Sequence, residues 1–213
     1  VSGPTTTQAL ELVYGWVMAW DTEGTRRRLK EAATAEFAER GLAGTTMTRI
    51  AARAGLNKER LYSYYGDKDA LWAVVLTDEL ERLASAVELS GVGLEDIGEF
   101  AGATFDYHAA HPALGRLLQW EGLTRGPAVH AAQRSAHYRD KVARFAQAQR
   151  DGLLNTGLDP AHLVFALIAL AAWWQTVPQL AEMITGATGD DPTERDRRRA
   201  FVVEAARRLA AAR

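Results

Sequence analysis

Residues 50–68 read IAARAGLNKERLYSYYGDK, and their spacing is that of two short helices joined by a tight turn. Ala51 is small where the second helix would cross the first, and Gly55 can take the positive φ that the turn requires. Asn57 stands where the second helix needs an N-cap. The apolar residues that would share one buried wedge are Ile50, Ala54, Leu56, Leu61 and Tyr65. The stretch therefore predicts a helix-turn-helix, a DNA-reading element.

The segments on either side of this motif also follow a definite order. Residues 29–41 form an amphipathic pattern with Leu29, Ala33 and Phe37 on one face, ended by Gly41. Thr45, Thr46 and Thr48 then offer hydroxyl caps, and Asp67 is the expected cap of a long following helix. Together with Ile-Ala-x-x-Ala-Gly, Leu-Tyr-x-Tyr-Tyr and Asp-Lys-x-x-Leu, this order resembles the TetR family of bacterial transcriptional regulators over about residues 25–76.

The whole chain is expected to be all-α, because no run of residues alternates with period two. The resemblance implies an N-terminal three-helix helix-turn-helix DNA-binding domain followed by a larger helical ligand-binding and dimerisation domain. We expect residues 1–24 to be an N-terminal extension, either helical or disordered, residues 25–70 to be the DNA-binding domain and residues 71–213 the helical domain. Further helices are expected over 94–111, 112–123, about 128–155, 160–185 and from 192 onward.

Charge is unevenly distributed along the 213 residues. The net charge is only -2, yet residues 25–68 hold ten Lys and Arg against five acids, a balance of +5. The remaining residues hold 15 basic against 22 acidic side chains, a balance of -7. A basic head on an acidic body suits a protein that touches phosphate with one end.

The composition excludes several other classes of protein. Cysteine is absent, so disulfides and thiolate chemistry are excluded. The longest apolar run, Leu163 to Trp174, has 12 residues and is too short to span a bilayer. No secretory signal pattern precedes the first charged residue, Glu11, so a cytoplasmic location is expected.

DNA contacts are predicted on the second helix of the motif and around it. Lys58, Arg60 and Ser63 are expected to reach base edges, as residues of a recognition helix do. The resemblance implies phosphate contacts for a second group of residues: Thr46, Thr48, Tyr62, Tyr64 and Lys68. We add Arg49 to this group, because it lies outside the expected buried wedge. Glu59 is expected to form an ion pair with a neighbouring basic side chain such as Arg53, since a carboxylate that faces phosphate is repelled.

The two closing helices predict a homodimer. Residues 163–174 are apolar all round and must be covered on both sides, which a second copy would do. The predicted interface consists of Leu163, Leu167, Leu170, Trp174, Phe201, Ala205 and Leu209. Such a dimer would bind a palindromic double-stranded operator. The alternative is a monomer that buries both helices in its own core.

The resemblance also implies a cavity among the middle helices for a small organic effector, and repression as the mode of action. The candidate effector-binding residues are Phe105, His108, Gln119, Trp120, Phe145 and Trp173, with Tyr107 and Gln175 as further large or mixed-character side chains. Their mixture favours a mostly apolar molecule with one or two polar groups. The alternative is a constitutive DNA-binding or architectural protein without an effector.

An enzyme is the other class to weigh. His108 and His111 are three apart on a predicted helix and could bind a metal with Asp106 or Glu121. Such pairs more often cap helix ends or line cores, and the motifs of dinucleotide binding and of the serine nucleophile elbow are absent. We therefore expect no enzymatic activity, no cofactor and no metal. The basic run at 195–199 is expected to be a solvated face, because acids surround it.

Overall fold

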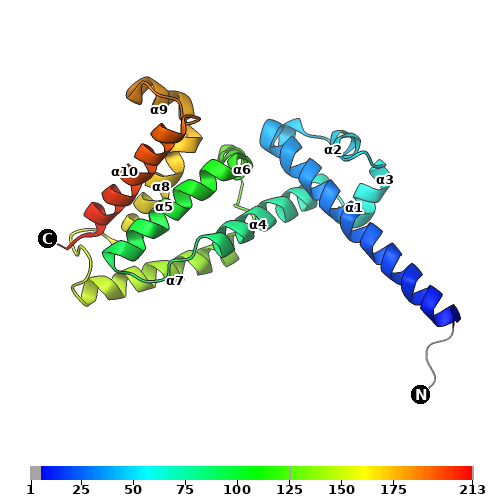
Figure 1. The fold of residues 1–213 in the computed structure, drawn as a ribbon, viewed down its shortest axis with the longest axis horizontal. Helices are drawn as coiled ribbons and strands as arrows, with labels where there is room; N and C mark the ends of the chain where they lie inside the picture. The colour runs from blue at the N-terminus through cyan, green and yellow to red at the C-terminus, as the bar shows by residue number, and fades with distance from the viewer. Residues whose placement is uncertain (1–5, 125, 213) are drawn as a thin grey trace, which may run out of the picture. The chain divides into compact units, whose positions relative to one another are not determined.

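The computed structural model describes residues 6–124 and 126–212, with side chains from residue 23 onward (Figure 1). Within this part of the chain every regular element is an α-helix, which confirms the predicted all-α fold. The helices are α1 (Thr6–Gly44), α2 (Met47–Ala54), α3 (Lys58–Tyr65), α4 (Lys68–Ala86), α5 (Leu94–Ala110), α6 (Pro112–Leu123), α7 (Ala131–Arg150), α8 (Pro160–Thr176), α9 (Pro178–Thr185) and α10 (Pro192–Ala210).

The chain divides into two compact units, with the boundary inside α4 between Val75 and Leu76 rather than after residue 70. Helix α1 begins at Thr6, so the backbone of the expected N-terminal extension is helical from that residue. The sequence of this extension also spaces apolar residues at helical intervals, and these lie outside the residues whose side chains are described: Leu10, Val13, Tyr14, Val17 and Trp20.

The N-terminal unit forms because each turn of its sequence has the residue that the turn requires. Gly55 has φ 66° between α2 and α3, a left-handed conformation that glycine adopts without strain. Asn57 caps α3 by accepting a hydrogen bond from the backbone N–H of Arg60 at 3.0 Å. Gly41 has φ 67° and ψ 178°, so it interrupts the last turns of α1 where the sequence predicts a stop.

The core of this unit lies among α1, α2, α3 and the first turns of α4. The rings of Phe37 and Trp72 meet edge to face, with 5.2 Å between their centroids. Its other large buried side chains are Leu29, Ile50, Leu61, Leu71 and Val75. These contacts leave the polar side of α3 on the outside of the unit.

The C-terminal unit packs α5 against α8 and α10, and α8 also packs against α6 and α7 (Figure 1). Gly102 permits the close approach of α5 and α10, because a Cβ there would lie 2.9 Å from Cγ2 of Val203. Phe105, Phe145 and Leu167 are among the side chains buried at the centre of the unit.

The predicted apolar helix over residues 160–185 is wrong in one respect, because the structure breaks it in two. Helix α8 ends at Thr176 and α9 begins at Pro178, and the two are bent by 87°. Pro178 has no N–H to continue the ladder, and its ring disfavours the helical conformation at Val177. In the described part of the chain no single helix is long and apolar enough to cross a membrane, although this bent pair together reaches the required length and composition.

The prediction of a solvated face at residues 195–199 is also wrong at two positions. Arg198 is buried, and its guanidinium donates to Glu194 at 2.8 Å and to the carbonyl oxygen of Ala187 at 2.6 Å. Arg199 donates to Asp106 of α5 at 2.7 Å. The arginines therefore hold α10 against the rest of its unit, since their carboxylate and carbonyl partners compensate the buried charge.

Candidate nucleic-acid interface and ligand cavity

Helix α3 presents the predicted base-reading residues outward because Leu61 anchors its opposite side. Leu61 is fully buried, whereas Lys58, Arg60 and Ser63 are exposed. The ammonium of Lys58 lies 5.4 Å from the centre of the Tyr62 ring, a cation–π distance that positions both side chains on the first turns of the helix. The exposed face of α3 thus offers two cations and a hydroxyl in the arrangement that major-groove recognition uses.

The predicted phosphate-contacting residues lie at the start of α2 and around α3. Thr46 caps α2 by accepting from the backbone N–H of Arg49 at 3.2 Å, and Thr48 is exposed on the first turn. Tyr62 is exposed, while the ring of Tyr64 is partly covered by the guanidinium of Arg26 at 5.1 Å.

Lys68 begins α4 and is tied to the turn before α2. Its ammonium donates to the carbonyl oxygen of Thr45 at 3.2 Å. This bond uses one of the three ammonium donors, so two remain for a phosphate.

Two arginines of α2 converge on one buried carboxylate of α1. Glu36 accepts from Nε of Arg49 at 3.0 Å and from Nη1 of Arg53 at 2.9 Å. Arg53 also donates to Glu39 at 2.7 Å, so the expected partnership of Arg53 with Glu59 is wrong. Burial alone would raise the pKa of Glu36, but the hydrogen bonds and charges of Arg49 and Arg53 leave that pKa below its ordinary value.

Glu36 is absent from the predicted site, because the prediction for residues 29–41 used only their apolar face. The signal was present, since an acid lies between Ala33 and Phe37, beside the stripe that must be buried. A carboxylate there needs a cation, and α2 supplies two.

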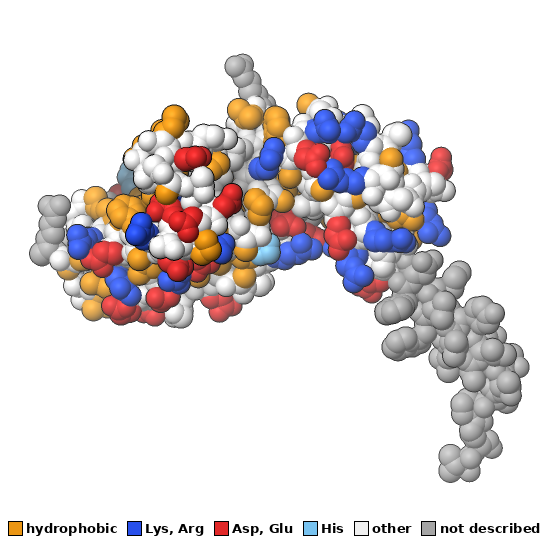
Figure 2. Space-filling view, turned by 45° about the horizontal axis from the view of Figure 1, so that its top comes forward, with side chains coloured by type: hydrophobic (Ala, Val, Ile, Leu, Met, Phe, Trp, Pro, Cys, Tyr) orange, Lys and Arg blue, Asp and Glu red, His pale blue; other side chains and the backbone are white. Residues whose placement is uncertain are grey.

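Figure 2 shows Lys and Arg side chains spread over the face of the N-terminal unit that it draws, with carboxylates among them. This distribution agrees with the balance of +5 over residues 25–68. The carboxylate of Glu36 partly neutralises Arg49 and Arg53, whereas Lys58 and Arg60 of α3 are exposed.

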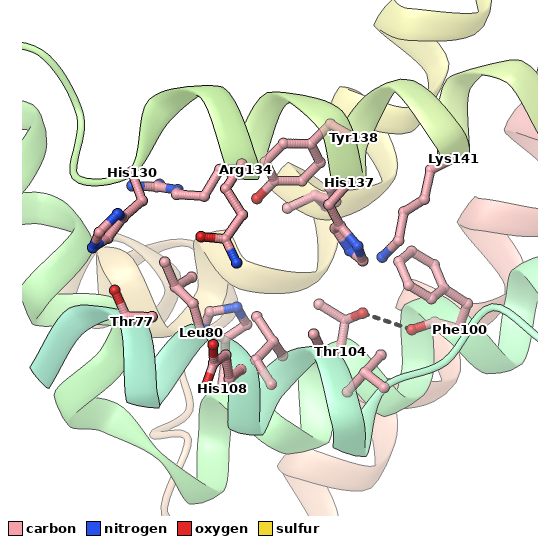
Figure 3. Close-up of a pocket in the computed structure, with 16 residues that line it drawn as sticks. Thr77, Leu80, Phe100, Thr104, His108, His130, Arg134, His137, Tyr138 and Lys141 are labelled. Carbon is pink, nitrogen blue, oxygen red and sulfur yellow. Dashed lines mark hydrogen bonds between the residues drawn. The ribbon is translucent and has the colours of Figure 1, made fainter. Parts of the chain in front are cut away.

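The C-terminal unit contains a cavity of about 200 Å³ among α4, α5, α7 and α8 (Figure 3). Its apolar wall includes Leu80 and Leu83 of α4, Phe100 of α5 and Ile168 of α8. Its polar lining comes largely from the first three turns of α7 and the residue before them: His130, Gln133, Arg134, His137, Tyr138 and Lys141.

The positive groups of the cavity differ in how they are neutralised. Arg134 is bound to Glu121 at 2.8 Å. Lys141 instead faces the Phe100 ring, with 4.7 Å between Nζ and the ring centre. Burial lowers the pKa of Lys141, and the charge of Arg144 lowers it further. Burial also lowers the pKa of His108, with a further effect of His111.

Comparison with known proteins gives two family matches. A model described as "Bacterial regulatory proteins, tetR family" matches residues 29–75, and one described as "Tetracyclin repressor-like, C-terminal domain" matches residues 96–208, more than half of the chain. The chain belongs to the TetR family.

Individual relatives match this chain over three quarters of its length or more. The HTH-type transcriptional repressor SCO4008 of Streptomyces coelicolor is 42% identical over 90% of this chain and 97% of its own. The HTH-type transcriptional regulator RutR of Escherichia coli is 27% identical over 76% of this chain and 79% of its own. The crystal structure of the putative transcriptional regulator SCO4942 from Streptomyces coelicolor superposes with a TM-score of 0.75 at 34% identity, covering 87% of this chain and 98% of that one. The protein is therefore a TetR-type DNA-binding regulator.

Of the effector-binding residues predicted from this TetR resemblance, the structure brings His108 to the cavity. Phe105 and Phe145 are fully buried in the core, and Trp173 is 56% exposed on α8. The other two, Gln119 and Trp120, lie on α6, which does not contribute to the lining. The cavity therefore uses a different set of residues from the predicted one.

The residues that the prediction missed lie on one face of α7 and at its start. His130, Arg134, His137 and Lys141 follow one another at intervals of four, three and four, which is the spacing of a single helical face. The signal in the sequence is this periodic basic face, whereas the prediction rested on large and mixed-character side chains of the middle helices.

The carboxylates suggested for a metal site have other partners. Asp106 accepts from Arg199, and Glu121 accepts from Arg134 and from the backbone N–H of Val129. Among the described residues, no group of three His, Cys, Asp or Glu side chains is placed to hold a metal ion.

The predicted dimer residues fall into two groups. Leu163 and Leu167 are buried in the chain's own core, so their side chains are not available to a partner, which corrects the prediction at these two positions. The others keep exposed area: Leu170, Trp174, Ala205 and Leu209 are partly buried and Phe201 is 56% exposed. Phe165 and Trp173, which the interface prediction did not include, are strongly exposed on α8.

Proposed function

We propose that this protein is a homodimeric repressor that binds a palindromic operator through α3 and leaves it when a small organic effector occupies the cavity. The observation that carries the proposal is α3 itself, whose buried Leu61 turns Lys58, Arg60 and Ser63 outward from a capped helix. Because its partner is genomic DNA and its family is bacterial, we place it in the cytoplasm.

Base reading is assigned to the first turns of α3. The guanidinium of Arg60 and the ammonium of Lys58 can donate to O6 and N7 of guanine, and each good contact discriminates by about 1–3 kcal/mol. Thr46, Thr48, Arg49, Tyr62, Tyr64 and Lys68 are assigned to the phosphates. These contacts set the orientation of the protein on DNA and carry no sequence information.

Dimerisation is assigned to the exposed apolar side of α8 and α10. Phe165 is 74% exposed, and Trp173 and Phe201 are each 56% exposed. Phe165 and Trp173 are eight residues apart on α8, so they lie on one face of the helix. Large apolar groups clustered on a surface support association with a second copy, which would bring two α3 helices to successive major grooves.

The cavity favours an effector-controlled repressor over a constitutive or architectural DNA-binding protein. A filled core would favour the architectural role, whereas about 200 Å³ is hollow here and lined by both apolar and polar groups. An effector that binds the two conformations of the protein with different affinity shifts DNA binding by a coupling of about 1–3 kcal/mol.

The proposal is tested by selecting bound fragments from a genomic DNA library with the full-length protein at two salt concentrations. We expect one palindrome that remains enriched at the higher salt. Binding that is equal for all sequences and vanishes at the higher salt would mean that the protein contacts only the phosphates. That result would reject the operator-specific repressor.

A further inference from the structure

One end of the cavity carries a positive charge without a counter-ion among the described residues. Figure 3 shows His137 and Lys141 projecting from α7 into the cavity beside Phe100. No carboxylate of the described chain forms an ion pair with Lys141, whose ammonium is partly buried and faces an aromatic ring. An ammonium withdrawn from water needs a compensating charge, and an aromatic face supplies only part of it.

We infer that the cavity binds a small organic carboxylate, with its anionic group at Lys141 and His137 and its apolar body against Leu80, Leu83 and Ile168. The inference rests on the proposed function, because it names the chemical class of the effector.

The size of the cavity suits a ligand of about one ring. Cavities of about 150 Å³ bind benzene, so about 200 Å³ holds one ring with a carboxylate. The wall opposite α7 is formed by aliphatic side chains of α4 and α8, which suit the ring. Thr104 already donates its hydroxyl to the carbonyl oxygen of Phe100 at 2.7 Å, so the donors left at this end belong to Lys141 and His137.

The remaining charges of the lining do not favour a cation. Glu81 is the one Asp or Glu among the described residues of the lining, and it is exposed, so water screens its interactions. Arg134 is neutralised by Glu121 outside the lining. The charge that a ligand can compensate is therefore the ammonium of Lys141.

Three molecules of nearly equal shape test this inference: benzoate, benzamide and benzamidine. Titration calorimetry of the full-length protein should give benzoate at least tenfold tighter binding than neutral benzamide, and weaker binding still for the cation benzamidine. Equal affinities, no binding of benzoate in the millimolar range, or a preference for benzamidine would overturn the inference.

A variant pair locates the charge. Lys141→Met keeps the length of the side chain and removes the ammonium, so benzoate affinity should fall at least tenfold while benzamide affinity changes less than twofold. Arg139→Met removes a cation from an exposed position of the same helix outside the lining and should change neither affinity. Circular dichroism confirms that both variants are folded. If Arg139→Met weakened benzoate binding as much as Lys141→Met, non-specific attraction between the anion and the basic helix would explain the binding. The assigned site would then be wrong.

Ligand binding and operator binding are measured separately, so the ligand class and the repressor function are tested independently. Operator binding without any ligand tests the repressor. If the operator is bound and benzamidine is preferred, the repressor stands and the ligand class is wrong. If benzoate binds through Lys141 while no operator is found, the ligand class stands and the repressor is wrong.

Discussion

Glu36 of α1 accepts a hydrogen bond from Arg53 of α2, with 2.9 Å between Oε1 and Nη1. The same carboxylate accepts from Arg49 at 3.0 Å, so one buried acid fixes two successive turns of α2 against α1. Since Thr46 and Thr48 stand on the first turn of α2, their position relative to α3 depends on this carboxylate.

Glu36→Gln should destabilise the protein by about 1–2 kcal/mol, because it removes a buried charge whose arginine partners remain partly exposed. The folded-state pKa of Glu36 is lowered from 4.5. Its stabilisation is therefore fully present above about pH 4.5 and is lost as the pH falls through the folded value. Urea unfolding between about pH 3 and pH 7 should show a shallower acid slope for the variant than for the wild type.

Glu39→Gln serves as the control for that change. Glu39 is 44% exposed and accepts from Nη2 of Arg53, so its replacement should lower the free energy of unfolding by less than about 0.5 kcal/mol. Equal losses of stability for the two variants would show that the burial of Glu36 adds nothing to the stability that its ion pairs provide.

Arg60→Ala and Lys68→Ala should weaken DNA binding in different ways. Loss of a base contact at Arg60 should reduce affinity for the operator by about 1–3 kcal/mol and leave random DNA almost unaffected. Loss of a phosphate contact at Lys68 should weaken both and reduce the slope of log K against log salt by about 1. Fluorescence anisotropy over a salt series measures both effects. Equal losses on operator and random DNA for Arg60→Ala would remove it from the base-reading set.

Phe165→Glu should weaken the proposed dimer, because it places a charge on the exposed apolar face of α8. Leu123→Glu on α6 is the matched control, since Leu123 and Phe165 are both 74% exposed. Light scattering at micromolar concentration should show a dimer for the wild type and for Leu123→Glu, and monomer for Phe165→Glu. A wild-type monomer at that concentration would reject both the dimer and the palindrome.

Benzoate binding should strengthen as the pH falls from about 8 to about 6. Burial lowers the pKa of His137, the charge of Lys141 lowers it further, and Asp140 acts in the opposite direction. A bound carboxylate favours the protonated imidazole, so binding takes up a proton. The other titratable or charged side chains lining the cavity are Glu81, His108, His130, Arg134, Tyr138 and Lys141.

Calorimetry in two buffers of different ionisation enthalpy measures that proton uptake. His137→Gln should abolish it and make benzoate affinity independent of pH over this range. Proton uptake that persists in the variant would assign the titration to another group of the cavity.

The helix-turn-helix could be predicted from the sequence because its determinants are local. Gly55, Asn57 and Asp67 each act within three or four residues of themselves, and all three have the predicted roles in the structure. Pro178 is an equally local signal, but the prediction of one helix over residues 160–185 gave more weight to the apolar run that precedes it. In the structure the proline breaks that helix.

The cavity could not be predicted in the same way, because it depends on which helices meet. Phe145 and Lys141 lie one turn apart on the same side of α7, yet Phe145 packs in the core and Lys141 lines the cavity. Helical periodicity places the two residues on one face without saying which neighbour each will meet. The same limit explains Leu167, whose apolar surroundings suggested a partner subunit although its own chain covers it.

Gly102 and Gly115 should respond to alanine with opposite signs. Both lie inside helices, where replacing glycine by alanine normally stabilises by about 0.5–1 kcal/mol. A Cβ at Gly115 meets nothing within 4 Å, so Gly115→Ala should gain that amount. A Cβ at Gly102 would lie 2.9 Å from Cγ2 of Val203, a branched side chain that cannot turn aside freely.

Gly102→Ala should therefore force α5 and α10 apart and lower stability by about 1–3 kcal/mol despite its better helix propensity. The double variant Gly102→Ala with Val203→Ala tests the cause, because removal of Cγ2 should make the alanine at 102 less costly than it is beside valine. Thermal unfolding of the four proteins completes the double-mutant cycle. Additive losses at the two positions would mean that Cγ2 of Val203 is not what opposes a Cβ at residue 102, where the guanidinium of Arg199 is the other near neighbour.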